Sequence, residues 1–201
     1  MALRIGLLGC GRIGQVHARS IEALNGAEVV AVADALPEAA EVMAARTGAA
    51  VRGADTLLGS GDVDAVVIGT PTDTHFDLIR GAARHGKAIF CEKPIDMSVD
   101  NIRACMDAVG AAGVPFMTGF NRRFDPNFAA LRSRIAAGDV GAVELATITS
   151  RDPAPPPISY IARSGGLFRD MMIHDFDMAR FLMAEEFVRV HAVGAALVQS
   201  A

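Results

Sequence analysis

The sequence predicts an α/β protein: a doubly wound parallel sheet, followed by the first part of an α+β domain. Short β-branched runs alternate with longer stretches that are apolar every three or four residues, as far as Gly119. The strand-like runs show little polar alternation, which is typical of sheets covered by helices on both faces. From Phe120 onward this alternation stops. We therefore expect two domains, residues 1–120 and residues 121–201.

The elements of the first domain follow from this pattern in chain order. A β–α–β alternation favours parallel strands joined by right-handed crossovers. We expect strands at Leu3–Leu8, Glu28–Ala33, Ala65–Gly69, Lys87–Cys91 and Val114–Met117. We expect helices at Ile13–Leu24, Pro37–Thr47, Thr74–His85 and Ser98–Ala112.

The remaining residues mix helical and strand-like patterns without a strict order. We expect only the opening portion of a second α+β domain here. The predicted elements are a helix opened by Asn121–Pro126, a strand-like run at Val143–Thr149, a proline-rich loop at 153–157, a helix at Leu167–Met183 and a strand-like run at Val188–Val198.

The composition excludes several classes of protein. Of 201 residues 51% are apolar and 21% charged, which favours a folded chain over disorder. The apolar stretches are far shorter than the roughly 20 residues of a membrane span, and the amino terminus lacks the apolar core of a signal peptide. A net charge of −4, a single Tyr and no Trp give no footprint for nucleic acid. We expect a cytoplasmic protein that binds neither membranes nor nucleic acid.

The cysteines and histidines indicate no metal centre. Cys10, Cys91 and Cys105 form no CxxC pair and are odd in number, so we expect reduced core residues rather than a disulfide framework. The five histidines include no close pair at ligand spacing.

A glycine loop directly follows the first predicted strand and fits the pattern G-x-G-x-x-G. Gly9 permits the tight turn, Gly11 lets a pyrophosphate approach the backbone, and Gly14 lets helix and strand pack closely. Arg12 and Ile13 open the helix, whose N–H groups and positive dipole end attract phosphates. We predict a Rossmann dinucleotide site; a glycine-rich turn without a ligand is the alternative.

An acidic residue ends the second predicted strand, twenty residues after Gly14. Asp34 is placed to accept hydrogen bonds from the ribose hydroxyls of an adenosine and to repel a 2′-phosphate. Its neighbours Ala35 and Leu36 supply no cation for that phosphate. The sequence therefore favours NAD over NADP, with a simple helix cap as the other interpretation of Asp34.

A lysine follows the strand predicted at Lys87–Cys91. Ligands of doubly wound sheets bind at the carboxyl ends of the strands, and Lys93 lies there between Glu92 and Pro94. Such a lysine can reach a substrate hydroxyl, although an exposed lysine is often only a solvated cation.

The stretch from Gly165 to Asp175 offers a partner for this lysine. Asp170 and His174 are four residues apart, so on one helix both side chains project from the same face. Histidine is a suitable base for a hydroxyl proton at neutral pH, and a nearby lysine stabilises negative charge on the oxygen. A surface pair or an interior hydrogen bond is the alternative for these two residues, and ordinary solvated acids for Asp175 and Asp177.

Taken together, these residues resemble the Gfo/Idh/MocA oxidoreductases, and most of all their inositol branch. The resemblance covers essentially the whole chain. Because members of this family continue beyond its length, the resemblance implies that the chain is part of a longer protein or a truncated product. Its segments are Ile5–Gly14, Thr70–His75, Glu92–Pro94, Gly119–Asp125 and Gly165–Asp175.

The resemblance implies a role for individual residues. Lys93, Asp170 and His174 match the catalytic residues, with His174 as proton acceptor, Asp170 as its orienting partner and Lys93 as a substrate-holding cation in the proton relay. Arg122 and Asp152 match positions that contact polyol hydroxyls. The nicotinamide half of the cofactor site is implied to include Thr70, Pro71, His75 and Glu92. For Thr72 and Asp73 a polar turn that caps the next helix is the better interpretation, and for Arg123 a structural ion pair.

The resemblance also implies an activity: NAD-dependent oxidation of myo-inositol to 2-keto-myo-inositol (scyllo-inosose), by a homo-oligomer, commonly a tetramer. Oxidation of another cyclic polyol or sugar, such as scyllo-inositol or glucose, stays open. A non-catalytic NAD-binding regulator is the alternative of a different class. Either dehydrogenase activity requires the strand end with Lys93 and the stretch with His174 to meet one nicotinamide ring; if they do not meet, only a nucleotide pocket remains.

Overall fold

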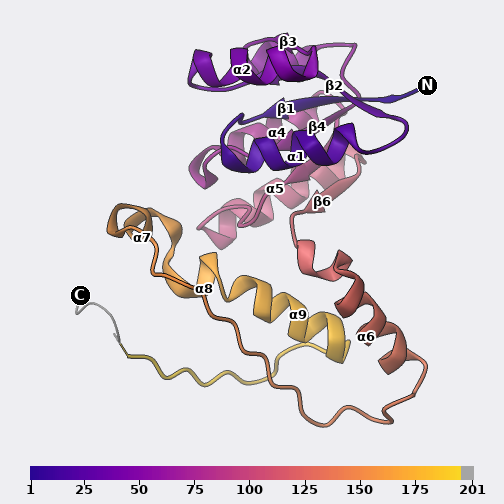
Figure 1. The fold of residues 1–201 in the computed structure, drawn as a ribbon, viewed down its shortest axis with the longest axis vertical. Coiled ribbons are helices and arrows are strands. Elements are labelled where there is room, and N and C mark those ends of the chain that lie inside the picture. The colour runs from indigo at the N-terminus through magenta and orange to yellow at the C-terminus, as the bar shows by residue number, and fades with distance from the viewer. Residues whose placement is uncertain (196–201) are drawn as a thin grey trace. The chain divides into compact units, whose positions relative to one another are not determined.

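A computed structural model describes residues 1–195, apart from the side chains of residues 159, 162 and 163. The chain divides into two compact units, one ending at Gly119 and the other beginning at Phe120 (Figure 1). Within the described residues, no helix has both the length and the apolar character needed to cross a membrane.

The first unit is built on a six-stranded parallel sheet with the order β3-β2-β1-β4-β5-β6. The order reverses between β1 and β4, which is where sheets of this class bind ligands. The strands are β1 (Leu3–Leu8), β2 (Ala27–Ala33), β3 (Ala50–Val51), β4 (Ala65–Ile68), β5 (Ala88–Cys91) and β6 (Phe116–Thr118). The helices are α1 (Arg12–Glu22), α2 (Pro37–Thr47), α3 (Ala54–Gly59), the 3₁₀-helix η1 (Thr72–Thr74), α4 (His75–Arg84) and α5 (Val99–Ala112).

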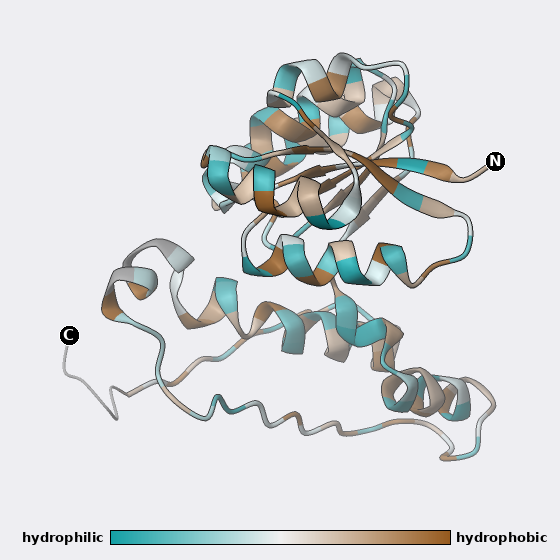
Figure 2. Cartoon of the chain, turned by 45° about the horizontal axis from the view of Figure 1, so that its top comes forward, coloured by the Kyte–Doolittle hydropathy of each residue, from teal (hydrophilic) through white to brown (hydrophobic). Residues whose placement is uncertain are grey.

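Helices cover both faces of this sheet, and hydrophobic strands run between them (Figure 2). On one face α1 and α2 contribute Ile21 and Met43 to an apolar cluster. On the other face α4 and α5 contribute Ile79 and Cys105 to a second cluster. Burial on both faces explains why the strands show so little polar alternation.

The cysteines belong to this core, as predicted. Cys10, Cys91 and Cys105 are free and buried. Burial, followed by the charge of Asp34, raises the pKa of the Cys10 thiol to about 11. Cys10 is therefore a protonated packing residue at neutral pH although it lies inside the glycine loop.

Every strand and helix predicted for the first unit is present, with ends shifted by at most two residues. The prediction missed β3 and α3. β3 has only two residues and both are exposed, so it carries no readable pattern. Because β3 is an additional strand, the strand that precedes Lys93 is the fifth of the chain, whereas it was the fourth of the predicted strands.

The second unit is helical in its described part. Asp125 caps α6, because its carboxylate accepts the N–H groups of Asn127 and Phe128. The elements are the 3₁₀-helix η2 (Asn121–Phe124), α6 (Pro126–Ala136), α7 (Ile158–Ser164), α8 (Gly166–Asp170) and α9 (Ile173–Met183).

The strands predicted for this unit are wrong where they can be compared. Val143–Thr149 and residues 188–195 adopt no regular secondary structure, and no sheet pairing involves them within residues 120–195. A strand is stabilised by a hydrogen-bonded neighbour, which an apolar pattern by itself does not provide. Residues 196–198 of the second predicted strand lie outside the described residues.

The helix predicted at Leu167–Met183 is divided in two, and α7 was not predicted. At the break, the N–H of Met172 bonds to the carbonyl of Leu167, five residues earlier, and the N–H of His174 bonds to the carbonyl of Met171. The regular ladder of i to i−4 bonds is interrupted there. Asp170 thus ends α8 while His174 lies in α9, so the argument from one helical face was wrong.

Candidate active site

The three glycines of the loop after β1 serve different purposes. Gly9 has φ +95°, and a Cβ there would lie 2.7 Å from the backbone of Gly69. A Cβ on Gly14 would lie 2.0 Å from the carbonyl oxygen of Gly9. Around Gly11 a Cβ would meet nothing within 4 Å. The loop is closed by its outer glycines and open at the middle one, as a pyrophosphate requires.

The helix that follows points its amino-terminal end at this opening. Gly11 is the N-cap of α1, which begins at Arg12. Ile13 packs toward Gly69, where a Cβ would lie 3.2 Å from its side chain. N–H groups at the first turn and the positive end of the dipole suit an anion. The loop therefore fits the phosphates of a dinucleotide.

Asp34 follows β2 and is bonded to the same loop. Its Oδ2 accepts the N–H of Cys10 at 2.6 Å, and its Oδ1 accepts the N–H of Leu36 at 2.8 Å. A carboxylate has about four lone-pair positions, so both oxygens can still accept ribose hydroxyls. Asp34 therefore acts as a local turn residue and remains available to a nucleotide.

The loop after β4 contains the predicted residues Thr70, Pro71 and His75. The Thr74 hydroxyl donates to the carbonyl of Pro71 and shares a second hydrogen bond with the hydroxyl of Thr70, both at 2.7 Å. Thr74 is the N-cap residue of α4 but its side chain makes no capping hydrogen bond, and Thr72 and Asp73, which were expected to cap this helix, lie in η1. This network fixes the backbone at the carboxyl end of β4.

The His75 ring is 1% exposed. Its Nε2 lies 2.9 Å from the carbonyl oxygen of Thr70, and its Nδ1 lies 2.9 Å from that of Pro94. Both nitrogens are thus engaged by backbone, and His75 ties the loop after β4 to the loop after β5. The sequence did not predict this connection.

Lys93 is half-buried at the carboxyl end of β5, and its peptide bond to Pro94 is cis. Its N–H donates to Oε2 of Glu92 at 3.2 Å, while Oε1 of Glu92 lies 2.8 Å from Nε2 of His17 on α1. Burial is the largest effect on the Glu92 pKa and raises it. The hydrogen bond and charge of His17, with Lys93, outweigh burial and lower the pKa overall. Glu92 is therefore an ionised carboxylate held between two elements.

In the second unit, Arg122 of η2 is held by an acidic residue of α9. It donates from Nη1 to Oδ1 of Asp175 and, at 3.3 Å, to the hydroxyl of Ser150. Ser150 in turn donates to the same carboxylate oxygen at 2.6 Å. The Asp175 side chain is 13% exposed, so Asp175 is not an ordinary solvated acid. Asp152, two residues beyond Ser150, is exposed.

Arg123 and Asp177 form a second pair between η2 and α9. The guanidinium donates to Oδ2 at 2.8 Å and to Oδ1 at 2.6 Å, and the Asp177 side chain is 5% exposed. The guanidinium also lies over the ring of Phe181, 5.3 Å from its centroid. The structural ion pair predicted for Arg123 is confirmed, whereas the solvated acid considered for Asp177 is wrong.

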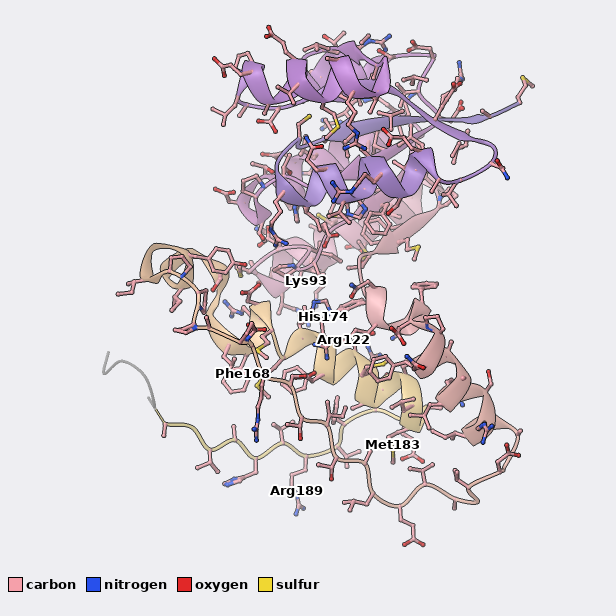
Figure 3. All side chains as sticks on the ribbon, viewed as in Figure 1. Lys93, Arg122, Phe168, His174, Met183 and Arg189 are labelled. Atoms are coloured by element: carbon pink, nitrogen blue, oxygen red, sulfur yellow. The ribbon has the colours of Figure 1, made fainter. Side chains whose placement is uncertain are left out.

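Asp170 and His174 lie on either side of the break between α8 and α9. Oδ1 of Asp170 accepts the Tyr160 hydroxyl at 3.0 Å. The half-buried ring of His174 meets the ring of Phe120 edge-on, with centroids 6.4 Å apart. His174 on α9 and Arg122 on η2 are both labelled in Figure 3. The orienting role of Asp170 toward His174 stays a prediction.

Sequence reasoning missed three participants in these networks: His17, Ser150 and Phe120. His17 follows Gly14 by three residues, so the helical period places it on the same side of α1. From that spacing, the position of His17 beside the glycine loop could have been predicted. Ser150 is recognisable only once the fold brings it to Arg122.

Family models match both parts of the chain in order. The model described as an oxidoreductase family with an NAD-binding Rossmann fold matches residues 3–120, and the GFO/IDH/MocA C-terminal domain matches residues 128–200. The inositol 2-dehydrogenase of Rhizobium meliloti (strain 1021) is 57% identical over all 201 residues of this chain. The chain spans 61% of the length of that curated relative.

Solved structures agree with this relationship. A myo-inositol dehydrogenase from Corynebacterium glutamicum is 49% identical with a TM-score of 0.86, over 90% of this chain and 55% of that one. A scyllo-inositol dehydrogenase from Lactobacillus casei with bound NAD(H) and scyllo-inositol is 28% identical with a TM-score of 0.80, over 92% of this chain and 57% of that one. The open glycine loop, the parallel sheet and both matched models identify the chain as a member of the Gfo/Idh/MocA family of NAD-binding oxidoreductases.

Proposed function

We propose that this protein catalyses the NAD-dependent oxidation of myo-inositol to 2-keto-myo-inositol. The observation that carries the proposal is the combination of a dinucleotide loop after β1 with a lysine at the carboxyl end of β5 in the same sheet, in a chain 57% identical to an inositol 2-dehydrogenase. The chain spans 61% of the length of that relative, so the activity is proposed for the whole protein.

The cofactor site in this proposal uses the residues described above. Bound NAD supplies a hydride acceptor at its nicotinamide ring. The backbone between Gly9 and Gly14 holds the pyrophosphate, and Asp34 accepts the ribose hydroxyls and disfavours NADP. Thr70, Pro71 and Glu92 are proposed to line the nicotinamide half, with His75 behind them.

The chemistry requires a base and a positive charge. Oxidation of a secondary alcohol transfers the C–H hydrogen as hydride and removes the O–H proton. We assign the proton to His174, whose orientation Asp170 is proposed to support. Lys93 stabilises the negative charge that develops on the oxygen, and Arg122 and Asp152 contact other hydroxyls of the ring. The products are the ketone, NADH and one proton.

Absorbance of NADH, followed with NAD and a panel of polyols, tests the proposal. Formation of NADH with myo-inositol is the expected result. Formation of NADH only with scyllo-inositol supports the second candidate, which the scyllo-inositol dehydrogenase of known structure suggests. NAD binding with no turnover of any polyol would support a regulator and contradict the proposal.

The roles of Lys93 and His174 are tested by replacing each with alanine. Each variant is expected to lose turnover by about 10²-fold or more, with little change in the Kd for NAD. An equal loss of cofactor binding contradicts the assignment and gives these residues a structural role.

A further inference from the structure

Lys93 lies between two residues that are each held by a histidine. On its amino-terminal side, the carboxylate of Glu92 meets Nε2 of His17 at 2.8 Å. On its carboxyl-terminal side, the carbonyl of Pro94 meets Nδ1 of His75 at 2.9 Å. His17 comes from α1 and His75 from the start of α4, so different elements hold the two sides.

The contact with His17 leaves the Glu92 carboxylate little freedom. The side chains of His17 and Glu92 are 18% and 17% exposed. The His17 ring also meets Phe90 edge-on, with centroids 5.0 Å apart. Gly119 closes another side, since a Cβ there would lie 3.0 Å from Oε2 of Glu92. The same Oε2 accepts the N–H of Lys93.

The contact with His75 is fixed by burial. Its ring faces two carbonyl oxygens, which can only accept hydrogen bonds. A neutral ring donates to one of them and a cationic ring to both. In either state the 1% exposed ring holds the loop of Pro94 against the loop of Thr70.

We infer that His17 and His75 are positioning residues for Lys93, acting through Glu92 and Pro94 on either side of it. This inference rests on the proposed function, in which Lys93 acts on the substrate oxygen. The side chain of lysine is long and flexible, so its reach is set by where the backbone starts. Misplacement of a reacting group by about 1 Å can cost about 10²-fold in rate.

Three variants and a control test the kinetic consequence in the full chain. His17→Leu and His75→Asn are expected to lower kcat by about tenfold to a hundredfold, while the KM for the polyol and the Kd for NAD change less than about threefold. His17→Gln keeps a donor toward Glu92 and is expected to recover most of the lost kcat. His85→Ala is the matched control, because His85 is an exposed histidine at the other end of α4.

Lysine labelling provides a readout that does not require turnover. The chain has two lysines, Lys87 and Lys93. Lys87 is 8% exposed and donates from Nζ to the carbonyls of Ser60 and Val63, so it serves as an internal reference. Under reductive methylation followed by mass spectrometry, His17→Leu and His75→Asn are expected to shift the labelling rate of Lys93 relative to Lys87. His17→Gln and His85→Ala are expected to keep it.

The two readouts together decide the inference. A lower kcat with a shifted Lys93 rate in folded variants supports positioning. An unchanged Lys93 rate overturns it, whatever happens to kcat, and so does an unchanged kcat in an active enzyme. Should the native chain turn over no polyol, the proposed function fails, and the labelling rates still decide whether the histidines position Lys93. Should His17→Leu or His75→Asn unfold, His17→Ala or His75→Gln replaces it beside the same control, and an unchanged Lys93 rate in the folded replacement overturns the inference.

Discussion

Individual glycines of the loop are required for different reasons, some for folding and some for ligand binding. A Cβ on Gly14 would overlap the carbonyl of Gly9, whereas one on Gly11 would enter open space. Gly11 also has φ −68°, which any residue adopts. Gly14 is thus required by the fold, and Gly11 is required only if a ligand approaches the backbone.

Gly11→Ala and Gly14→Ala should therefore fail in different ways. We expect Gly11→Ala to keep the native Tm but to raise the Kd for NAD by about tenfold or more, equal to about 1.4 kcal/mol. Gly14→Ala is expected to lose stability as well, by about 1–3 kcal/mol, because backbone must move. Calorimetry of unfolding and of NAD binding separates the two effects. A Gly11→Ala variant that binds NAD normally would contradict the predicted pyrophosphate position.

Cofactor selectivity is predicted to depend on a single carboxylate. Replacing Asp34 by Ser is expected to weaken NAD binding by about tenfold, since a hydrogen bond to a charged group contributes about 1.5–3 kcal/mol. It should also improve the ratio of NADP to NAD affinity, because the charge that repels a 2′-phosphate is gone. Fluorescence titration with each nucleotide measures both. Asp107→Asn, an exposed acid on α5, is the control, and an unchanged NADP to NAD ratio in Asp34→Ser would exclude the selectivity role.

At the scale of elements, η2 and α9 are joined by a buried ion pair. Removing the Arg123 side chain leaves the carboxylate of Asp177 buried at 5% exposure without its guanidinium. We expect Arg123→Ala to lower the free energy of unfolding by about 2–3 kcal/mol. This is slightly less than the cost of removing one partner of a fully buried ion pair, because Arg123 itself is partly exposed. Urea unfolding measures the loss in free energy of unfolding, and hydrogen exchange of the α9 amides shows whether it occurs at this helix. Arg134→Ala, exposed at the end of α6, should change little, and an equal effect of both variants would refute this account.

Acid sensitivity is expected at the ion pair between Arg52, which follows β3, and Asp62, which precedes β4. The hydrogen bond from Arg52, followed by its charge, lowers the pKa of Asp62 to about 2, against about 3.9 in an unfolded chain. A lowered pKa stabilises the fold above the unfolded value, and this contribution disappears as the pH falls through the folded value.

Arg52→Gln should accordingly be less stable than the native chain at about pH 6 and equal to it at about pH 2. Because the pair is exposed, the difference should be small and should shrink in salt. Urea midpoints at both pH values test this, with Arg84→Gln, which alters an exposed arginine of α4, as the control. A deficit that persists undiminished at about pH 2 would assign the effect to packing and not to the charge pair.

Across the whole molecule, the features that were predictable from the sequence are those that depend on short segments of it. β1, β4 and β5 were predictable because each is an apolar run covered on both faces, and the glycine loop because its residue types are dictated by backbone geometry. The break between α8 and α9 was not predictable. Met171 and Met172 are good helix formers, and no glycine or proline marks the point where the helix is interrupted. The contacts of His17 with Glu92 and of Arg122 with Ser150 join residues 75 and 28 positions apart, and local patterns contain nothing about such pairs.

The distribution of burial predicts where independent stability resides. Both apolar clusters consist of residues between Ile5 and Phe116, and the six-stranded sheet, from Leu3 to Thr118, also lies in the first unit. In the second unit, by contrast, Leu145 is 84% exposed and Val188 fully exposed. Since burial of apolar surface is the main stabilising contribution, the first unit already holds what folding requires.

A chain ending at Gly119 should therefore fold alone and bind NAD within about threefold of the affinity of the 201-residue chain, a difference below about 0.7 kcal/mol. It should have no turnover, because it lacks His174, the proposed proton acceptor. Circular dichroism, cooperative urea unfolding and calorimetric titration with NAD test this, with Gly11→Ala in the shortened chain as the binding control. If the shortened chain is unfolded, the second unit supplies necessary stability, and the first unit does not by itself hold what folding requires.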